Sequence, residues 1–348
     1  MTPIAVTPPA PRDDDELEEM LSRPAPAVID ALRRIPGDVI VLGAGGKMGP
    51  SLTTMVRRAA DALHDSREVI AVSRFSSPEA ATQLERAGVR VLRAELGSRD
   101  AIARLPDAPN VIYMAGQKFG TRDLPSRTWA VNTLVPAMVA ERYSTSRIVA
   151  FSTGNVYSLS PSTSSGSNES DALTPVGEYA NSCVGRERVL EHVSRTYGTP
   201  MSIIRLNYAV DLRYGVLVDI AHHIAAGEPV RVDMGYVNVI WQGDANAQAI
   251  RALEIATSPP FVVNVTGAER LSVRDTAARL GELLGSQPRF EGKEAPDALL
   301  SDTSLARSRF GLPEVSTETL IEWVAAWVAR GGTRLGKATK FEVRDGRY

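Results

Sequence analysis

Short apolar runs alternate with amphipathic stretches through the first two thirds of the chain. The first run, residues 39–42, is apolar and β-branched, which is typical of a strand buried on both faces of a parallel sheet. Later runs predict strands at 68–73, 89–93, 110–114, 147–152 and 201–206, with intervening helices that include 128–143 and 179–196. This alternation predicts an α/β fold with a doubly wound parallel sheet, whose ligands lie at the carboxyl ends of the strands.

The alternation loosens after residue 208, which we interpret as a smaller C-terminal lobe. Helices are predicted there at 216–226, 245–256, 273–284 and 317–329, with short strands at 230–233 and 261–265. Ahead of the first strand, the proline-rich residues 1–12 are predicted to be disordered. Two short helices, at 13–21 and 27–34, are predicted to pack on the body or on a partner subunit.

Three glycines at three-residue spacing, Gly43, Gly46 and Gly49, follow the first strand and lead into an amphipathic helix. Gly43 lets the chain turn sharply, Gly46 lets the backbone approach a pyrophosphate, and Gly49 lets the helix pack close to the sheet. The amides and dipole at the start of that helix hold negative charge. The pattern therefore favours a dinucleotide site over the alternative, a glycine-rich turn without a ligand.

These features divide the chain into four parts. Residues 1–37 form an N-terminal arm, and 38–210 form the dinucleotide-binding domain, to which some C-terminal segments return. Residues 211–330 form a substrate lobe. Residues 331–348, which are charged and contain glycine, form an extended tail.

Composition excludes several classes of function. The formal net charge of −2 gives no basic footprint, so neither nucleic acid nor an anionic membrane is expected as a partner. Cys183 is the only cysteine, which excludes an intrachain disulfide, and the N-terminal stretch lacks the pattern of a signal peptide. No apolar run is long enough to span a bilayer, and the histidines have no metal-ligand spacing. We expect a cytoplasmic protein without a metal site.

The serine-rich stretch at 158–175 predicts a loop between a strand end and the helix that carries Tyr179. This position suits a plain surface linker and a substrate lid about equally well. Both interpretations stay open at this point.

The end of the second strand bears on the choice of cofactor. Folds that prefer NAD place an acidic residue there for the ribose 2′-hydroxyl, whereas this chain has Ser73 and Arg74. A hydroxyl and a guanidinium suit a 2′-phosphate. We therefore expect NADP, with NAD as the alternative.

Several motifs together resemble those of a known family. After the three glycines come, in matching order, Tyr113-Met114-Ala115-Gly116, Asn132, Ser152-Thr153-Gly154-Asn155-Val156-Tyr157 and Tyr179. In this the chain is similar to the extended short-chain dehydrogenase/reductase family of NAD-dependent sugar epimerases and dehydratases. Further matches in the C-terminal lobe, including Asp244 and Gly267, extend the resemblance over residues 38–310.

The resemblance implies that Thr153 and Tyr179 face the substrate beside the nicotinamide. The Tyr179 hydroxyl would pass a proton to or from a carbonyl or alcohol oxygen, and Thr153 would hydrogen-bond the same oxygen. The alternatives are an ordinary strand-end hydroxyl and an ordinary aromatic residue at a helix start. The family's lysine, four residues after the tyrosine, is replaced by Cys183. Lys118 is the candidate for a substitute cation, unless it is an exposed loop residue.

The motifs and the resemblance together predict the remaining site residues. For the cofactor these are Gly43, Gly46, Lys47, Met48, Gly49, Ser73, Arg74, Glu95, Leu96, Met114, Ala115, Gly116, Asn132 and Cys183. For the substrate they are Lys118, Asn155, Asn207 and Arg213.

The substrate implied is a sugar or a sugar derivative. Residues 235–244 lack the arginine with which nucleotide-sugar enzymes hold a diphosphate, so a smaller sugar, sugar acid or keto-sugar is at least as plausible. The expected function is that of an NAD(P)-dependent oxidoreductase or epimerase, and the expected assembly is a homodimer. The alternative is a non-catalytic dinucleotide-binding sensor or interaction protein, which the loss of the lysine favours.

Overall fold

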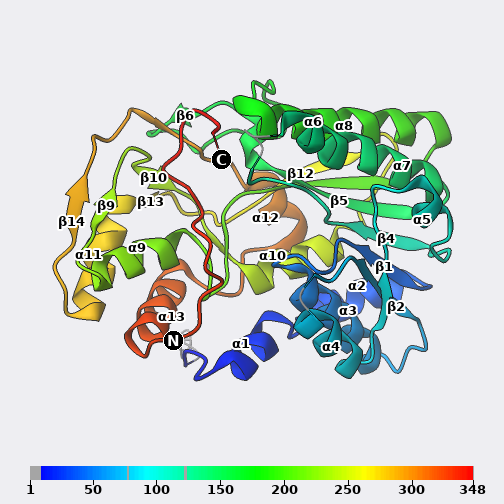
Figure 1. Cartoon of the computed structure of the whole chain (residues 1–348), viewed down its shortest axis with the longest axis horizontal. Helices are drawn as coiled ribbons and strands as arrows, with labels where there is room; N and C mark the ends of the chain where they lie inside the picture. The colour runs from blue at the N-terminus through cyan, green and yellow to red at the C-terminus, as the bar shows by residue number, and fades with distance from the viewer. Residues whose placement is uncertain (1–8, 77, 121–123, 348) are drawn as a thin grey trace.

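A computed structural model describes residues 9–76, 78–120 and 124–347. Its centre is a parallel sheet of seven strands in the order β12-β7-β5-β4-β1-β2-β3 (Figure 1). The strands are β1 Val39–Leu42, β2 Val69–Ser73, β3 Arg90–Arg93, β4 Asn110–Tyr113, β5 Arg147–Thr153, β7 Met201–Leu206 and β12 Phe261–Val265. The predicted doubly wound α/β fold is confirmed, and β12 is a C-terminal segment that returns to the central sheet.

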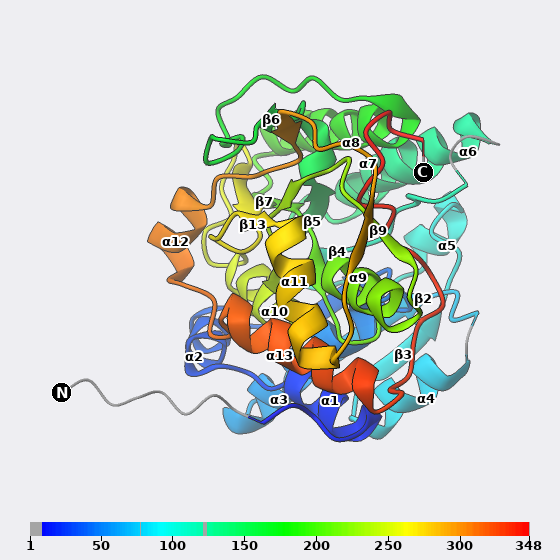
Figure 2. The same cartoon turned by 90° about the vertical axis from the view of Figure 1, so that its left-hand side faces the viewer.

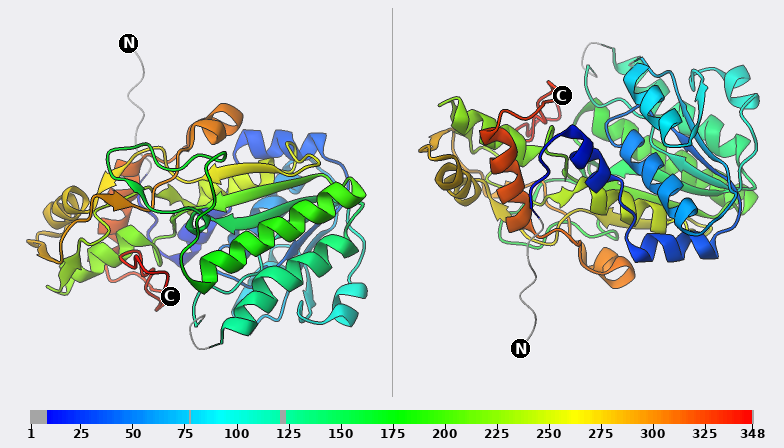
Figure 3. Two further views of the ribbon diagram at one scale, coloured as in Figure 1. Left: turned by 90° about the horizontal axis from the view of Figure 1, so that it is seen from above. Right: turned by 90° about the horizontal axis from the view of Figure 1, so that it is seen from below.

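Helices cover both faces of the sheet (Figure 3). One apolar cluster joins the sheet to α2 Pro26–Arg34, α3 Gly49–Ala62, α4 Pro78–Arg86, α10 Gln242–Arg251 and α12 Ser304–Phe310. A second cluster joins the other face to α5 Arg99–Ala103, α7 Val135–Arg142 and α8 Gly177–Tyr197. The helix predicted at 128–143 consists of α6 Pro125–Trp129, a π-helical turn η1 Ala130–Leu134, and α7.

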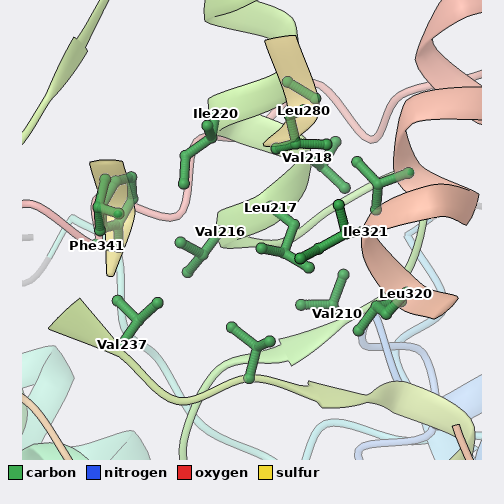
Figure 4. Packing of buried hydrophobic residues seen from close by; sticks show 14 of the residues in the cluster. Val210, Val216, Leu217, Val218, Ile220, Val237, Leu280, Leu320, Ile321 and Phe341 are labelled. Atoms are coloured by element: carbon green, nitrogen blue, oxygen red, sulfur yellow. The ribbon is translucent and has the colours of Figure 1, made fainter. Parts of the chain in front are cut away.

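The C-terminal lobe has its own apolar core, which Figure 2 shows from the lobe side and Figure 4 shows from close by. Its helices are α9 Val216–Ala225, α11 Val273–Leu284 and α13 Thr317–Ala329. Its short strands, β9 Pro229–Arg231, β10 Tyr236–Val237, β13 Leu271–Ser272 and β14 Arg289–Glu291, pair two by two as β10-β13 and β14-β9. Another pair, β8 Ala209–Val210 with β11 Ile240–Trp241, leads from the sheet into the lobe.

The N-terminal arm packs on the body of its own chain. Helix α1, Asp14–Leu21, buries Leu17 and Leu21 in the core of the lobe, whereas α2 packs on the sheet half. The arm thus connects both halves of the molecule. Of the stretch predicted to be disordered, residues 1–8 lie outside the described part, and Arg12 is ordered by a hydrogen bond to Glu16.

The serine-rich loop is anchored away from the carboxyl ends of β1 and β4. Its strand β6, Ser160–Pro161, pairs with β15, Asp297–Ala298, and Glu169 accepts a hydrogen bond of 2.7 Å from the amide of Asn264 in β12.

The tail forms neither helix nor strand, yet it is packed along its length. Figure 1 shows it in red, running along the boundary between lobe and sheet. Phe341 is buried in the core of the lobe, and Thr339 donates from its amide and its hydroxyl to Asp219, at 2.8 and 2.6 Å. Arg344 donates to the carbonyl of Asp297 at 2.8 Å. The predicted extended tail is therefore an integral wall of the molecule.

Candidate active site

Two cavities meet at the glycine turn, on the carboxyl edge of the sheet. The larger, of about 610 Å³, extends from the turn past the ends of β2, β3 and β4, and we call it the Ser73 cavity. The second, of about 340 Å³, lies between the turn, β5, the start of α8 and the lobe, and we call it the tyrosine cavity. Both are lined by Gly43, Gly46, Met114, Gly116 and Gln117, so one elongated ligand can pass from one cavity into the other.

The glycine turn has the geometry that a pyrophosphate site requires. Gly43 has φ +95°, and a Cβ there would lie 2.6 Å from the amide nitrogen of Ala115. A Cβ on Gly49 would lie 2.3 Å from the carbonyl oxygen of Ala44. A Cβ on Gly46, in contrast, would meet nothing closer than 3.4 Å. Gly43 and Gly49 are thus needed by the fold, whereas Gly46 leaves open space in front of the amides at the start of α3.

The structure distributes the predicted residues between the two cavities. The Ser73 cavity is lined by Ser73, Arg74, Glu95, Leu96 and Ala115. The tyrosine cavity is lined by Lys47, Met48, Gly49, Lys118, Thr153, Asn155, Tyr179 and Asn207.

Arg74 lies where the sequence predicts contact with a ribose. Its guanidinium is 3.6 Å from the carboxylate of Glu95, and both side chains are more than half exposed, at 64% and 59%. An exposed pair of this kind contributes little to stability, so both side chains can turn toward a ligand at small cost.

Thr153 and Tyr179 meet in the tyrosine cavity, as the resemblance implies. Thr153 ends β5 and Tyr179 lies in the first turn of α8, and both residues line the cavity. The Thr153 hydroxyl also donates to Oδ1 of Asn155 at 3.0 Å. Burial raises the pKa of Tyr179 well above its ordinary value, and the nearby charge of Arg186 opposes this only in part. Tyr179 is therefore a neutral phenol with a proton to donate.

Cys183 is buried behind Tyr179 and does not line the cavity. It follows Tyr179 by one turn of α8, and burial raises the pKa of its thiol. It packs with Val156 and Tyr157 in a small apolar cluster. A buried, protonated thiol in such surroundings is inert, so Cys183 replaces the family's lysine without replacing its charge.

Two cations lie near the place of the missing lysine. Lys118, half-buried at the cavity wall, has its ammonium 5.9 Å from the centroid of the Tyr179 ring. Arg186, two helical turns after Tyr179 on α8, lines the same cavity and is only 5% exposed. Sequence reasoning missed Arg186, although its spacing of seven residues from Tyr179 puts it on the same helix face.

Hydrogen bonds hold Arg186 in a fixed orientation. Its Nε donates to the carbonyl of Asn132 at 3.1 Å, Nη1 to the carbonyl of Phe151 at 2.7 Å, and Nη2 to Oδ1 of Asn132 at 2.8 Å. A guanidinium has five N–H donors, so two remain after these bonds. A Cβ on Gly116 would lie 2.8 Å from Nη2, which places this end of the guanidinium at the cavity wall.

Asn132 lies behind the lining residues rather than among them. From η1 its side chain accepts from the amide of Gln117 at 2.8 Å and donates to the carbonyl of Gln117 at 2.9 Å. It thereby holds the loop after β4, which carries both Gln117 and Lys118.

The prediction for Arg213 is wrong. It does not line the tyrosine cavity, and its guanidinium pairs with Asp211 at 2.6 Å and with Glu18 of the arm at 2.7 Å. Its charge is neutralised by these carboxylates at the junction of arm and lobe. Its neighbour Tyr214 lines the cavity instead. A turn at Asp211, which no periodic pattern signals, separates the two side chains.

The loop at 158–175 supplies no residue to the lining of the tyrosine cavity, whereas the tail supplies Thr339. Among the described residues no three histidine, cysteine, aspartate or glutamate side chains gather to hold a metal ion. No helix in that part of the chain is long and apolar enough to cross a membrane.

Comparison with protein families decides the class of the protein. The NAD dependent epimerase/dehydratase family matches residues 39–229, more than half of the chain. The chain belongs to this family. Membership confirms the predicted resemblance and makes the protein an NAD-dependent enzyme of the epimerase/dehydratase type. No curated protein sequence matches the chain.

Solved structures of this type are similar in fold. UDP-glucose 4-epimerase from Thermotoga maritima, solved with UDP-glucose, has a TM-score of 0.68 at 18% identity, over 84% of this chain and 99% of its own. UDP-glucuronic acid 4-epimerase from Bacillus cereus, solved with NAD, has a TM-score of 0.69 at 16% identity, with coverages of 84% and 99%. WbmG from Bordetella bronchiseptica, solved with NAD, has a TM-score of 0.70 at 18% identity, with coverages of 88% and 99%.

Proposed function

We propose that this epimerase/dehydratase family member reduces the carbonyl of a small sugar-derived substrate, with Tyr179 as proton donor. The observation that carries the proposal is that Thr153 and Tyr179 line one cavity, which continues past the glycine turn into the Ser73 cavity. The nicotinamide ring, when bound, supplies the hydride to the substrate carbon. The solved relatives with similar folds, which include UDP-sugar epimerases, support a sugar-like substrate.

Tyr179 and Thr153 have different roles at the substrate oxygen. Tyr179 gives its proton to the oxygen as negative charge develops there, and Thr153 donates a second hydrogen bond to the same atom. In the structure the single hydroxyl proton of Thr153 is donated to Oδ1 of Asn155, so this proton must turn to the substrate oxygen on binding, while the Asn155 amide still donates to the Thr153 oxygen. Because burial holds the pKa of Tyr179 high, the proton is present at neutral pH, and the reductive direction is favoured.

Arg186 takes over part of the role of the missing lysine. Its fixed charge lies on the same helix face as Tyr179 and opposes the effect of burial on the pKa of that tyrosine. Its two remaining N–H groups are available to ribose hydroxyls next to Gly116. Lys118, from the facing loop, is placed to contact the substrate.

Around the bound dinucleotide, the amides at the start of α3 receive the pyrophosphate, as in other dinucleotide folds. Ser73 and Arg74 receive the adenosine ribose. We propose NADP as the preferred form, because the Arg74 guanidinium is exposed and only loosely paired with Glu95.

An absorbance assay tests this function. Purified protein is incubated with NADPH or NADH and a panel of keto-sugars, sugars and sugar acids, and the nicotinamide absorbance is followed. We expect oxidation of NADPH with at least one carbonyl compound, and loss of turnover in Tyr179→Phe with dinucleotide affinity retained. Tight dinucleotide binding without turnover, and no difference between Tyr179→Phe and wild type with any compound, would establish the sensor alternative, which Cys183 favours.

We further propose a homodimer through α6 and η1. Trp129 and Leu134 are 39% and 51% exposed there, and neighbouring exposed apolar residues usually mark a contact surface. Light scattering after gel filtration should give twice the monomer mass for the wild type and a monomer for Leu134→Glu. A monomeric wild type would contradict the proposal.

A further inference from the structure

Lysine is rare in this chain and unevenly placed. Of the 39 basic residues, only five are lysine: Lys47, Lys118, Lys293, Lys337 and Lys340. Lys47 and Lys118 line the tyrosine cavity, and Lys337 and Lys340 of the tail come near them, so four of the five gather from three segments that are far apart in the sequence. The fifth, Lys293, is exposed and does not line either cavity. Arginine carries nearly all other positive charge, so this concentration of lysine is a local feature of the site.

The meeting point is the ring of Phe119, in the loop after β4. The ammonium groups of Lys47, Lys118 and Lys340 lie 5.3, 5.8 and 5.9 Å from its centroid. The Lys47 ammonium also lies 3.2 Å from the centroid of the Tyr214 ring. Aromatic faces attract cations and help to hold the lysine side chains in place.

The lysines act on one another as well as on the rings. Burial first, and then the charges of Lys337 and Lys118, lower the pKa of Lys47 to about 8. Burial, with a contribution from Lys340, lowers the pKa of Lys118 to about 8. The acidic groups that face this cluster are Asp219 and Glu342. Asp219 is engaged by the amide and the hydroxyl of Thr339.

The tail is shaped to bring its lysines to this place. Thr339 lies between Lys337 and Lys340 in the sequence and lines the cavity. Its amide donates a hydrogen bond to the carboxylate of Asp219 in α9. Lys340 has φ +54°, a left-handed conformation that costs energy for a residue with a side chain. Such strain persists where the surrounding contacts impose the conformation. Here the two neighbours of Lys340 are held in place, Thr339 by hydrogen bonds to Asp219 and Phe341 by burial in the core of the lobe.

We propose that Lys47, Lys118, Lys337 and Lys340 form a subsite for an oxyanion of the substrate, a carboxylate or a phosphoryl group on a monosaccharide. The inference rests on the proposed function, because it takes the tyrosine cavity as the substrate site. The cavity volume of about 340 Å³ is near the lower end for ligand sites, which suits a monosaccharide. The bound anion relieves the repulsion among the four ammonium groups, and the substrate carbonyl then lies toward Tyr179.

Binding experiments test the subsite separately from catalysis. Titration calorimetry first measures NADPH affinity, and then, in NADPH-saturated protein, the binding of D-glucuronate, D-glucose 6-phosphate, inorganic phosphate and D-glucose. The variants are Lys337→Ala, Lys340→Ala and the double variant, with Lys293→Ala as matched control. Because these tail positions carry no catalytic group and Lys337 is exposed, the variants should fold.

We expect one or both sugar anions to bind more tightly than D-glucose. Their affinity should fall about tenfold for each tail lysine removed, the effect of a charged hydrogen bond, and stay unchanged in Lys293→Ala. D-Glucuronate and D-glucose 6-phosphate distinguish carboxylate from phosphoryl recognition. Unchanged anion affinity in the double variant would overturn the subsite while leaving the proposed function intact.

A second outcome would also overturn the lysine subsite. If phosphate displaces NADPH, and the double variant loses NADPH affinity, the lysines hold the cofactor's pyrophosphate. Failure of the proposed function has a different signature, namely no dinucleotide binding, or no effect of Tyr179→Phe on turnover with any carbonyl compound.

Discussion

The two cavities at the glycine turn are built in different ways. The Ser73 cavity is lined by one continuous part of the chain, between Gly43 and Val135, and its polar side chains are exposed. The tyrosine cavity is lined by residues between Gly43 and Thr339, drawn from sheet, lobe and tail, and its charges are partly buried. The Ser73 cavity, which we call the cofactor side, is thus built within the first half of the sheet domain. The tyrosine cavity, which we call the substrate side, depends on the packing of segments that are distant in the sequence. The predictions below test this difference, beginning with the largest effect.

Replacing Arg186 should have the largest effect, because this buried guanidinium lines the tyrosine cavity and makes three hydrogen bonds. Arg186→Met removes three hydrogen bonds and leaves buried acceptors on Asn132 and Phe151, at about 1–3 kcal/mol for each acceptor. Arg186→Lys keeps the charge and should lose less stability. Chemical denaturation measures the loss.

The same variants report on Tyr179. Without the cation the pKa of Tyr179 rises further, so the pH profile of alcohol oxidation should move to higher pH in Arg186→Met and much less in Arg186→Lys. A folded Arg186→Met with an unmoved profile would show that the guanidinium has only a structural role.

A pair of glycine variants separates folding from binding on the cofactor side. Gly43→Ala forces a side chain into φ +95° and against Ala115, and should lower the free energy of unfolding by about 1–3 kcal/mol. Gly46→Ala should unfold like the wild type, because its Cβ has space, yet bind dinucleotide about tenfold more weakly or worse, since the Cβ keeps the pyrophosphate away. Thermal unfolding and fluorescence titration with NADPH measure the two effects. Full affinity in Gly46→Ala would place the pyrophosphate elsewhere.

Arg74 tests whether the cofactor side distinguishes NADP from NAD. Arg74→Ala should weaken NADPH binding by about 1.5–3 kcal/mol, the scale of a charged hydrogen bond, and leave NADH binding nearly unchanged. Arg90→Ala, an exposed arginine at the opposite end of the neighbouring strand, is the matched control. Equal losses for both cofactors would refute the role of Arg74.

The smallest expected effect is a pH dependence confined to the substrate side. Anion binding favours charged lysines, and the pKa values of Lys47 and Lys118 are lowered to about 8. Affinity for D-glucose 6-phosphate should therefore be greatest at about pH 7, above the second phosphate pKa of about 6 and below the pKa of both lysines, and should fall above pH 8 by up to about tenfold per pH unit for each lysine that loses its proton. D-Glucose binding and NADPH binding should not follow this curve. A flat curve for the anion would mean that neither lysine contacts it.

The sequence allowed prediction of most of the cofactor side. The spacing of Gly43, Gly46 and Gly49 predicts the turn, because Gly43 and Gly49 answer steric demands within one strand–turn–helix unit and Gly46 leaves space for a ligand. Thr153 and Tyr179 also came together as expected, since both lie at the carboxyl edge of the same sheet.

Prediction failed where distant segments meet. Arg213 was expected at the substrate, but its carboxylate partner Glu18 comes from an arm far away in the sequence. Thr339 was missed because the tail has no periodic pattern that would indicate what it contacts. Arg186 was within reach of helix periodicity, but its burial against η1 and β5 depends on contacts between distant segments.

The way in which the tail is held has a consequence for how the substrate reaches Tyr179. Residues 335–347 take part in no helix or sheet ladder, and depend on anchors such as Thr339 on Asp219 and Arg344 on Asp297. Segments of this kind open by local unfolding at a free energy below that of the whole protein. Amide hydrogens of the tail should therefore exchange with solvent long before those of β1 or β5, and more slowly once an anion is bound. The enzyme would then admit its substrate by the brief release of a peptide wall, while the sheet and the dinucleotide stay in place.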